Sequence, residues 1–283
     1  MNLPLSAAAA ETRFIEVNGQ RIAHRIVGNG SPIVAVTRMR GTIDTWDPLF
    51  LDSLAKHHTV VTVDWPGVGY SEGQLPGDMG AAAAFVDAFT RAVGIDRFAI
   101  LGWSWGGLAA QAFVTDKPER LTHAILVGTN PPGPPVHELT PEFIERAFKP
   151  VNDLADEEVL FFEPTSEASR AAAKASYERI RARPGVDERI PQTEQEIRAY
   201  LSAATRFRED LARREALKRT TVPILVLCGD NDISTQAANW FPLSNELQTA
   251  QLLVLPDTGH APQHQYPELA ASYIATFIAL TPR

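Results

Sequence analysis

Cysteine is nearly absent from this sequence. Its 283 residues include one cysteine, Cys228, which lies inside the apolar run VPILVLCGD at 222–230. A single thiol excludes an internal disulfide and favours a reducing compartment. Its apolar neighbours predict a buried strand residue rather than a catalytic thiol. Long apolar runs are lacking too, since none approaches the roughly 20 residues of a membrane-spanning helix.

An excess of positive charge is also missing. The net charge is −8 at pH 7, with 26 Lys and Arg against 34 Asp and Glu, so no basic surface for nucleic acid is indicated. The first residues, MNLPLSAAAAETR, have neither the basic start nor the apolar core of a signal peptide. We expect a cytoplasmic protein with no nucleic-acid or membrane partner, present as a monomer or homodimer.

Apolar, β-branched runs alternate with helical stretches in the first half of the chain. Two alternating runs flank Asn18-Gly19, a strong hairpin signal. Residues 78–94 have helical composition and end at a glycine, as a helix C-terminus often does. Near-continuous apolar strands separated by helices indicate an α/β protein with a parallel sheet covered on both faces. Four such strands are predicted, at 32–37, 58–64, 97–102 and 122–128.

The alternation stops at a proline-rich stretch that begins at Pro131. From about 138 to 219 the chain is rich in Glu, Arg and Ala and has no strand-like run. This predicts a helical insertion over 131–219 between two core segments, 1–130 and 220–283. The alternation then resumes with two further strands and a closing helix, at 222–230, 251–260 and 266–280.

A serine occupies the corner between one predicted strand and the helix after it. The stretch GWSWG (102–106) centres on Ser104, with a glycine on each side. Glycines tolerate the close backbone approach that a sharp, strained strand-to-helix turn requires. The turn exposes the hydroxyl at a helix N-terminus, where partial positive charge stabilises a developing anion. Ser104 is therefore a candidate nucleophile, the alternative being a tight turn with an incidental serine.

A serine nucleophile needs a base and a carboxylate that orients the base. Asp230 and Asp232 follow one of the late strands, and His260 follows the other. Since the carboxyl ends of parallel strands share one edge of the sheet, these residues are expected near Ser104. His264 is four residues beyond His260, but a metal site would need further ligands and no H-E-x-x-H motif is present. We predict no metal, and expect His264 on the surface.

These motifs together resemble the α/β-hydrolase superfamily over nearly the whole chain. DWPGVGYSEG (64–73) is similar to the family's D-x-P-G-x-G-x-S turn, GDNDIST (229–235) to its acid loop and PDTGHAPQHQYPE (256–268) to its histidine loop. The resemblance implies a mostly parallel eight-stranded sheet with flanking helices and a helical cap at 131–219. It also implies Ser104 as nucleophile, Asp232 as acid and His260 as base. Because the last residue of a G-x-x-D loop carries the role, Asp232 is preferred to Asp230.

The same resemblance places the oxyanion hole and exposes a departure from the family. The backbone N–H of Trp105, after the nucleophile, and that of Met39, after the strand at 32–37, are the expected donors. Most members have His-Gly in the second loop, whereas this chain has TRMRG at 37–41. Arg38 either turns outward to pair with a carboxylate, or Arg38 or Arg40 reaches into the pocket and binds a polar or anionic part of the substrate.

Aromatic residues are the candidates for the rest of the pocket. The ring of Trp105 is expected to line it, whereas Trp103 is as well explained by core packing. Asp64, in the D-x-P-G turn, is expected to stabilise that turn through hydrogen bonds. Four phenylalanines of the insertion could line an apolar pocket or pack within the cap, with Phe143 and Phe161 chosen as substrate-binding residues and Phe148 and Phe162 as further candidates.

The resemblance implies a cofactor-free serine hydrolase for a small-molecule substrate, with a carboxylic ester or lactone favoured. Related folds also catalyse C–C bond hydrolysis, perhydrolysis and lyase reactions, and a ligand receptor on a hydrolase scaffold is a non-enzymatic alternative. GWSWGG is similar to the G-x-D-W-G-G elbow of epoxide hydrolases and haloalkane dehalogenases. Those enzymes use an aspartate there, and a serine would give a stable ether, so both activities are excluded.

Overall fold

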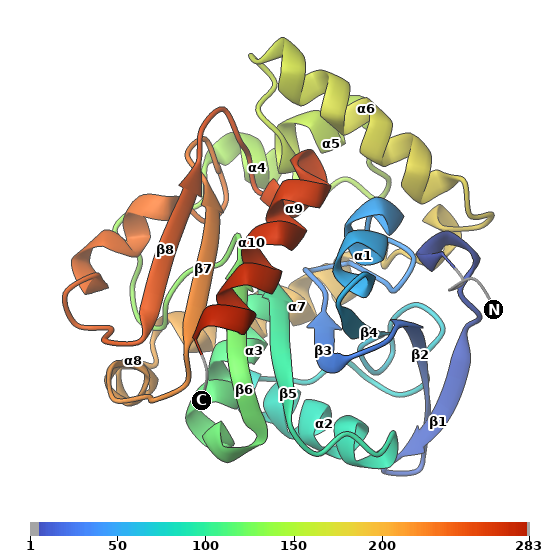
Figure 1. Ribbon diagram of the computed structural model, residues 1–283. Helices are drawn as coiled ribbons and strands as arrows, with labels where there is room; N and C mark the ends of the chain where they lie inside the picture. Colours follow the sequence, from blue (N-terminus) through green and yellow to red (C-terminus); the bar gives the residue numbers. More distant parts are fainter. Residues whose placement is uncertain (1–5, 282–283) are drawn as a thin grey trace.

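The computed structural model describes residues 6–281, and an eight-stranded sheet runs through its centre (Figure 1). The strand order is β1-β2-β4-β3-β5-β6-β7-β8. The first two strands pair antiparallel and β3 to β8 are parallel, which confirms the mostly parallel sheet. The strands are β1 (Arg13–Val17), β2 (Gln20–Gly28), β3 (Ser31–Val36), β4 (His58–Val63), β5 (Phe98–Trp103), β6 (Leu121–Val127), β7 (Ile224–Gly229) and β8 (Ala250–Leu255).

Helices cover both faces of the sheet. On one face lie α1 (Pro48–Ala55) and α10 (Pro267–Leu280), whose Phe50 and Ile274 belong to one apolar cluster. On the other lie α2 (Met79–Ala92) and α3 (Trp105–Asp116), whose apolar side chains belong to a second cluster. Burial on both faces explains why the central strands read as continuous apolar runs.

Local signals in the sequence set the ends of several elements. Asn18 and Gly19 both have positive φ (53° and 77°), as the tight turn between β1 and β2 requires. Asp78 caps α2 by accepting a hydrogen bond from the backbone N–H of Ala81 at 2.8 Å, and Gly94, at φ 75°, ends the turn that follows. The sequence therefore marks both ends of this helix.

The regular elements between β6 and β7 are all helices, joined by loops. They are α4 (Pro141–Ala147), α5 (Leu154–Phe161), α6 (Glu167–Arg181), α7 (Glu194–Arg208) and α8 (Leu211–Lys218). In Figure 1, α5 and α6 lie at the top, beyond the ends of β7 and β8. The structure has helices in this stretch but does not define where a cap domain would begin and end. The limits at 131 and 219 therefore stay a prediction.

The remaining helices are short. One α-helical turn, α9 (Pro262–Gln265), leads into α10. Single 3₁₀ turns are η1 (Ala7–Ala9), η2 (Pro118–Arg120), η3 (Asp187–Arg189), η4 (Ala237–Asn239) and η5 (Phe241–Leu243). None of the helices within residues 6–281 combines the length and hydrophobicity needed to cross a bilayer.

Candidate active site

Ser104 lies on a strained turn between β5 and α3. Its φ of 55° and ψ of −115° are unfavourable for a residue with a side chain, so the surrounding structure must impose them. A Cβ on Gly102 would lie 2.3 Å from the carbonyl oxygen of Gly106, and one on Gly106 would lie 2.3 Å from that of Val36. Both flanking glycines are therefore required by space, as the motif predicts.

His260 and Asp232 form a buried pair. The Nδ1 atom of His260 lies 2.8 Å from Oδ2 of Asp232, and both residues are 2% exposed. Because a carboxylate accepts, this contact places the imidazole proton on Nδ1 and leaves Nε2 free to take a proton. His260 also lines one cavity together with Ser104. The geometry is that of a base oriented by an acid beside a nucleophile.

The carboxylate of Asp232 is held ionised in a buried place. Burial raises its pKa, but the charge of His260 and the hydrogen bonds that it accepts outweigh this, and the pKa lies below its usual range. The donors are the backbone N–H groups of Ser234 and Thr235, at 2.7 and 2.8 Å, and the Thr235 hydroxyl at 2.8 Å. Thr235 thus orients Asp232, a role that no sequence motif predicted.

The rival acid, Asp230, has other partners. Its carboxylate accepts hydrogen bonds from the backbone N–H of Thr258 at 3.1 Å and from the side chain of Asn231 at 2.9 Å. It therefore ties the acid loop to the histidine loop. Between the two aspartates, the structure brings Asp232 to the imidazole of His260.

The expectation that His264 lies on the surface is wrong. His264 is buried, its ring centroid lies 4.7 Å from that of Trp103, and its Nε2 accepts a hydrogen bond from the backbone N–H of Asp47 at 3.2 Å. Burial lowers its pKa to about 4. Its place on α9 (Pro262–Gln265) brings this ring against Trp103 and, at 6.3 Å between centroids, Trp46. No three metal-ligating side chains cluster anywhere in residues 6–281.

Trp103 anchors the histidine loop as well as filling the core. Its indole Nε1 donates to the backbone carbonyl oxygen of His260 at 3.0 Å, and the side chain is 1% exposed. Gly128 packs from the other side, where a Cβ would lie 2.5 Å from that same oxygen and 3.1 Å from Nδ1 of His260. The first tryptophan of GWSWG therefore positions His260. The need for a residue without a side chain at 128 could not be predicted from the sequence.

The expected oxyanion donors lie at the ends of neighbouring strands. Met39 follows β3 and Trp105 begins α3, and both residues line a cavity with Ser104. Neither backbone N–H forms a hydrogen bond with another residue in 6–281, so both are free to bind an oxyanion. Asp64 stabilises the adjoining loops as predicted, accepting from the N–H of Ile43 at 2.7 Å and of Tyr70 at 2.9 Å.

Two cavities meet at Ser104. The larger has a volume of about 800 Å³, including space open to solvent, and a mainly apolar lining that includes Trp105, Phe143 and Tyr200. The smaller has a volume of about 330 Å³ on the same basis, and Phe143, Phe161, Arg38 and His260 are among its lining residues. Phe143 and Phe161 thus lie where a substrate would, whereas Phe148 and Phe162 line neither of these two cavities.

The two arginines of the loop after β3 have different surroundings. Arg38 does not turn outward to a carboxylate, because its guanidinium lies over the rings of Phe161 and Trp103, 4.5 and 5.2 Å from their centroids. Arg40, at φ 60°, points into the helical region. It donates to the carbonyl oxygens of Ala147, Lys149, Pro150 and Pro191 at 2.6–2.9 Å. Arg40 therefore fastens the inserted helices to the core.

Comparison with known proteins identifies the family to which this fold belongs. The family model described as alpha/beta hydrolase fold matches residues 39–267. The chain belongs to the α/β-hydrolase fold family. A solved α/β-hydrolase fold protein from Chitinophaga pinensis is 33% identical, with a TM-score of 0.88 over 98% of this chain and 100% of that one.

Two further relatives have names that state an activity. A pimeloyl-[acyl-carrier protein] methyl ester esterase of Nitrosomonas europaea is 26% identical over 266 residues, 89% of this chain and 96% of the relative. An esterase from Rhodococcus sp. ECU1013 has a TM-score of 0.71 at 22% identity, covering 98% of this chain and 99% of its own, a likeness of fold alone. The first of these similarities extends over most of both chains.

Proposed function

We propose that this α/β hydrolase is a cofactor-free serine hydrolase that cleaves a carboxylic ester or lactone. The observation that carries the proposal is the buried 2.8 Å contact between His260 and Asp232, in a cavity shared with Ser104. The esterase of Nitrosomonas europaea, similar over most of its length, supports ester hydrolysis rather than another reaction of this fold. The lone, buried Cys228 supports a reducing, cytoplasmic location as part of the same proposal.

The reaction proceeds through an acyl-enzyme. Nε2 of His260 takes the proton from Oγ of Ser104, and Oγ attacks the carbonyl carbon of the ester. Asp232 keeps the imidazole in the productive tautomer and stabilises its cation. The oxyanion is bound by the N–H groups of Met39 and Trp105, each worth about 3 to 4 kcal/mol in the transition state.

Collapse of the tetrahedral intermediate breaks the bond to the leaving group. His260 gives its proton to the departing alkoxide oxygen, and the alcohol leaves. A water molecule then loses a proton to His260 and attacks the acyl-enzyme. The second intermediate releases the carboxylic acid and returns the proton to Oγ of Ser104. In a lactone the leaving alcohol and the acid belong to one molecule.

The inserted helices act as a cap over this reaction. Phe143 of α4 and Phe161 of α5 line the smaller cavity, and Tyr200 of α7 lines the larger one. The backbone carbonyl of Tyr200 also accepts a hydrogen bond from Nε1 of Trp105 at 3.1 Å, which joins α7 to the turn at Ser104. The cap therefore supplies substrate-facing surface and is tied to the catalytic turn.

Labelling with a fluorophosphonate tests the proposal. An activated serine reacts rapidly, so wild-type protein is expected to be labelled at Ser104 and the Ser104→Ala variant to remain unlabelled. A series of p-nitrophenyl esters of increasing acyl length then measures hydrolysis directly. Absence of both labelling and hydrolysis in folded protein would favour a ligand receptor on a hydrolase scaffold.

A further inference from the structure

The guanidinium of Arg38 is poorly satisfied by the protein. Its hydrogen bond at 2.9 Å is to the backbone carbonyl of the adjacent Met39, and its Nε is buried with no partner among residues 6–281. Within that range it forms no ion pair, and its cation rests on the faces of Phe161 and Trp103. Arg38 is partly buried, and a cation withdrawn from water without a counter-ion is costly, so the rest of its guanidinium is available to a partner that is not part of the chain.

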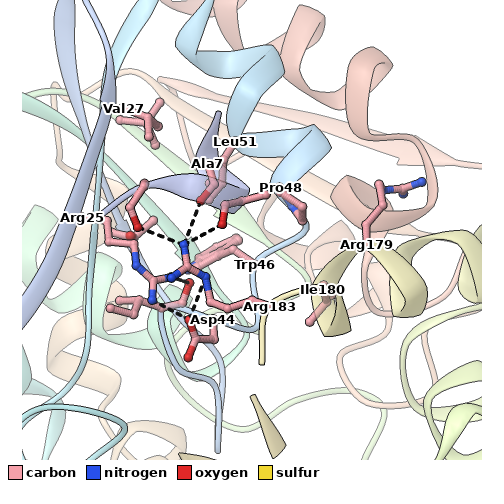
Figure 2. Close-up of a pocket in the computed structure, with 15 residues that line it drawn as sticks. Ala7, Arg25, Val27, Asp44, Trp46, Pro48, Leu51, Arg179, Ile180 and Arg183 are labelled. Carbon is pink, nitrogen blue, oxygen red and sulfur yellow. Dashed lines mark hydrogen bonds and ion pairs between the residues drawn. The ribbon is translucent and has the colours of Figure 1, made fainter. Parts of the chain in front are cut away.

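Other arginines near the inserted helices form ion pairs or hydrogen bonds with acceptors of the protein itself. Figure 2 shows another cavity, on the side of α1 and α6, away from the two at Ser104. There Arg25 lies 2.5 Å from Asp44, and Arg183 donates to the carbonyls of Ala8 and Ala10. Arg179 binds both carboxylate oxygens of Asp47 at 2.6 and 2.9 Å. These guanidinium groups have acceptors within the protein, and Arg38 differs from them in this respect.

Nearby charges do not neutralise Arg38. Glu157 is the carboxylate that acts on it, but Glu157 accepts a hydrogen bond from Arg181 at 2.9 Å, and Arg40 adds another positive charge. Burial lowers the pKa of Arg38 to about 10, so the guanidinium is still a cation at neutral pH. The cavity that holds Ser104 and His260 therefore carries a positive charge with no matching anion of its own.

We propose that Arg38 binds a carboxylate of the substrate. The enzyme then acts on esters in which one half, the acyl part or the alcohol part, is small and carries a free carboxylate. This inference rests on the proposed function and names its substrate class. The acidic half lies in the smaller cavity beside His260, and the other half lies in the larger, apolar cavity. A planar guanidinium fork matches a carboxylate with two parallel hydrogen bonds, and the two aromatic faces hold that fork in place.

Matched esters separate this role from a structural one. In an acyl series, mono-p-nitrophenyl glutarate is compared with its primary amide. In an alcohol series, butyrate esters of glycolic acid and of glycolamide are compared by titrating released acid. Each pair has the same shape and differs in one negative charge. The variants are Arg38→Gln and Arg38→Lys. The control is Arg198→Gln, which removes the same charge from an exposed side chain of α7.

Wild-type protein is expected to prefer the acidic ester in one series. Arg38→Gln should then lower kcat/KM for that ester about 10- to 100-fold, mainly through KM, because a hydrogen bond to a charged group is lost. The neutral ester should be little affected, and Arg38→Lys should restore part of the difference. Arg198→Gln should change neither ratio.

An equal loss for acidic and neutral esters in both series would overturn the proposal, as would a wild type without preference. If Arg38→Gln does not fold, inhibition of the wild type decides instead. Glutarate should then compete with a neutral ester more strongly than the uncharged diamide glutaramide, or glycolate more strongly than glycolamide. Equal inhibition in both comparisons would overturn the inference. Hydrolysis of neutral esters and labelling of Ser104 test the proposed function separately, because they do not depend on Arg38.

Discussion

Arginine lines several cavities of this protein, and two of them differ in how the positive charge is balanced. In the cavity of Figure 2, Arg25 meets a carboxylate and Arg183 meets both a carboxylate and backbone carbonyls. In the cavity at Ser104, Arg38 has one carbonyl of its own loop and two aromatic faces. The first arrangement satisfies the guanidinium groups within the fold, whereas the second leaves donors for a ligand.

The difference separates stability from function. A buried ion pair is expensive to break because it leaves one charge without a partner. An unpaired buried charge is expensive to keep, and its removal relieves part of that cost. Substitutions in the first cavity should therefore act on folding, and those in the second on the reaction.

Removal of the nucleophile or the base should have the largest effect. Ser104→Ala and His260→Ala are each expected to lower kcat on the order of 10⁶-fold, because either change abolishes acyl transfer. The measurement is kcat on a p-nitrophenyl ester, with thermal unfolding as the check that the variants fold. Substantial activity left in Ser104→Ala would contradict the assignment.

Exchange of the two aspartates should give unequal losses. Asp232→Asn removes the acceptor that fixes the imidazole tautomer and should lower kcat substantially, though less than loss of the base. Asp230→Asn is the matched control, since its carboxylate contacts Thr258 and Asn231 instead. A greater loss of kcat in Asp230→Asn than in Asp232→Asn would show that the acid has been misassigned.

Breaking the buried pair in the other cavity should affect stability. Arg25→Met leaves Asp44 buried with its closest partner gone, because Asp44 is otherwise 3.5 Å from Arg183. We expect the free energy of unfolding to fall by about 3–5 kcal/mol. Urea unfolding measures this, and kcat of the folded protein should stay close to that of the wild type. A large fall in kcat without a loss of stability would break the proposed division.

The sheet and the candidate reacting residues could be predicted from the sequence for a physical reason. Strands buried on both faces are continuous apolar runs, and ligand-binding residues follow directly after them. Ser104 and His260 could therefore be located from the order of strands and loops alone. The glycines beside Ser104 were informative because the space around the turn excludes any other residue.

The environment of buried polar groups could not be read in the same way. No motif gave His264 a role, so it was expected on the surface, yet its ring packs against Trp103. Arg38 and Arg40 have the same chemistry and lie two positions apart. Arg40 binds carbonyl oxygens of the inserted helical segment, whereas the guanidinium of Arg38 lies over Phe161 and Trp103. Such contacts join residues more than a hundred positions apart and leave no local pattern.

Low pH should lower the free energy of unfolding through His264. His264 accepts a hydrogen bond from Asp47, the residue that binds Arg179, and burial lowers its pKa to about 4. The unfolded chain binds a proton near pH 6.5, so stability falls as pH drops from about 6.5 to about 4. The positive charges of Arg38 and Arg179 favour the neutral ring further, and the charge of Asp47 opposes them.

The contribution of His264 is expected to be about 3 kcal/mol once the pH is below 4. Urea unfolding of the wild type and of His264→Gln at pH 7 and pH 4.5 measures it, since glutamine keeps an acceptor for Asp47 but does not titrate. The wild type should lose more stability between the two pH values than the variant does. Equal losses would mean that His264 is protonated as readily in the fold as in the unfolded chain.

The smallest effect on stability is expected at Arg38. Arg38→Met removes one hydrogen bond and the contact of a cation with two rings, worth about 0.5 to 2 kcal/mol, and relieves the burial of an unpaired charge. These opposing changes should leave the free energy of unfolding within about 1 kcal/mol of the wild type, against the much larger loss in Arg25→Met. Both variants lose a guanidinium and gain the same thioether, so urea unfolding compares them directly. If Arg38→Met costs as much stability as Arg25→Met, Arg38 is satisfied by the fold after all, and the distinction between the two cavities fails.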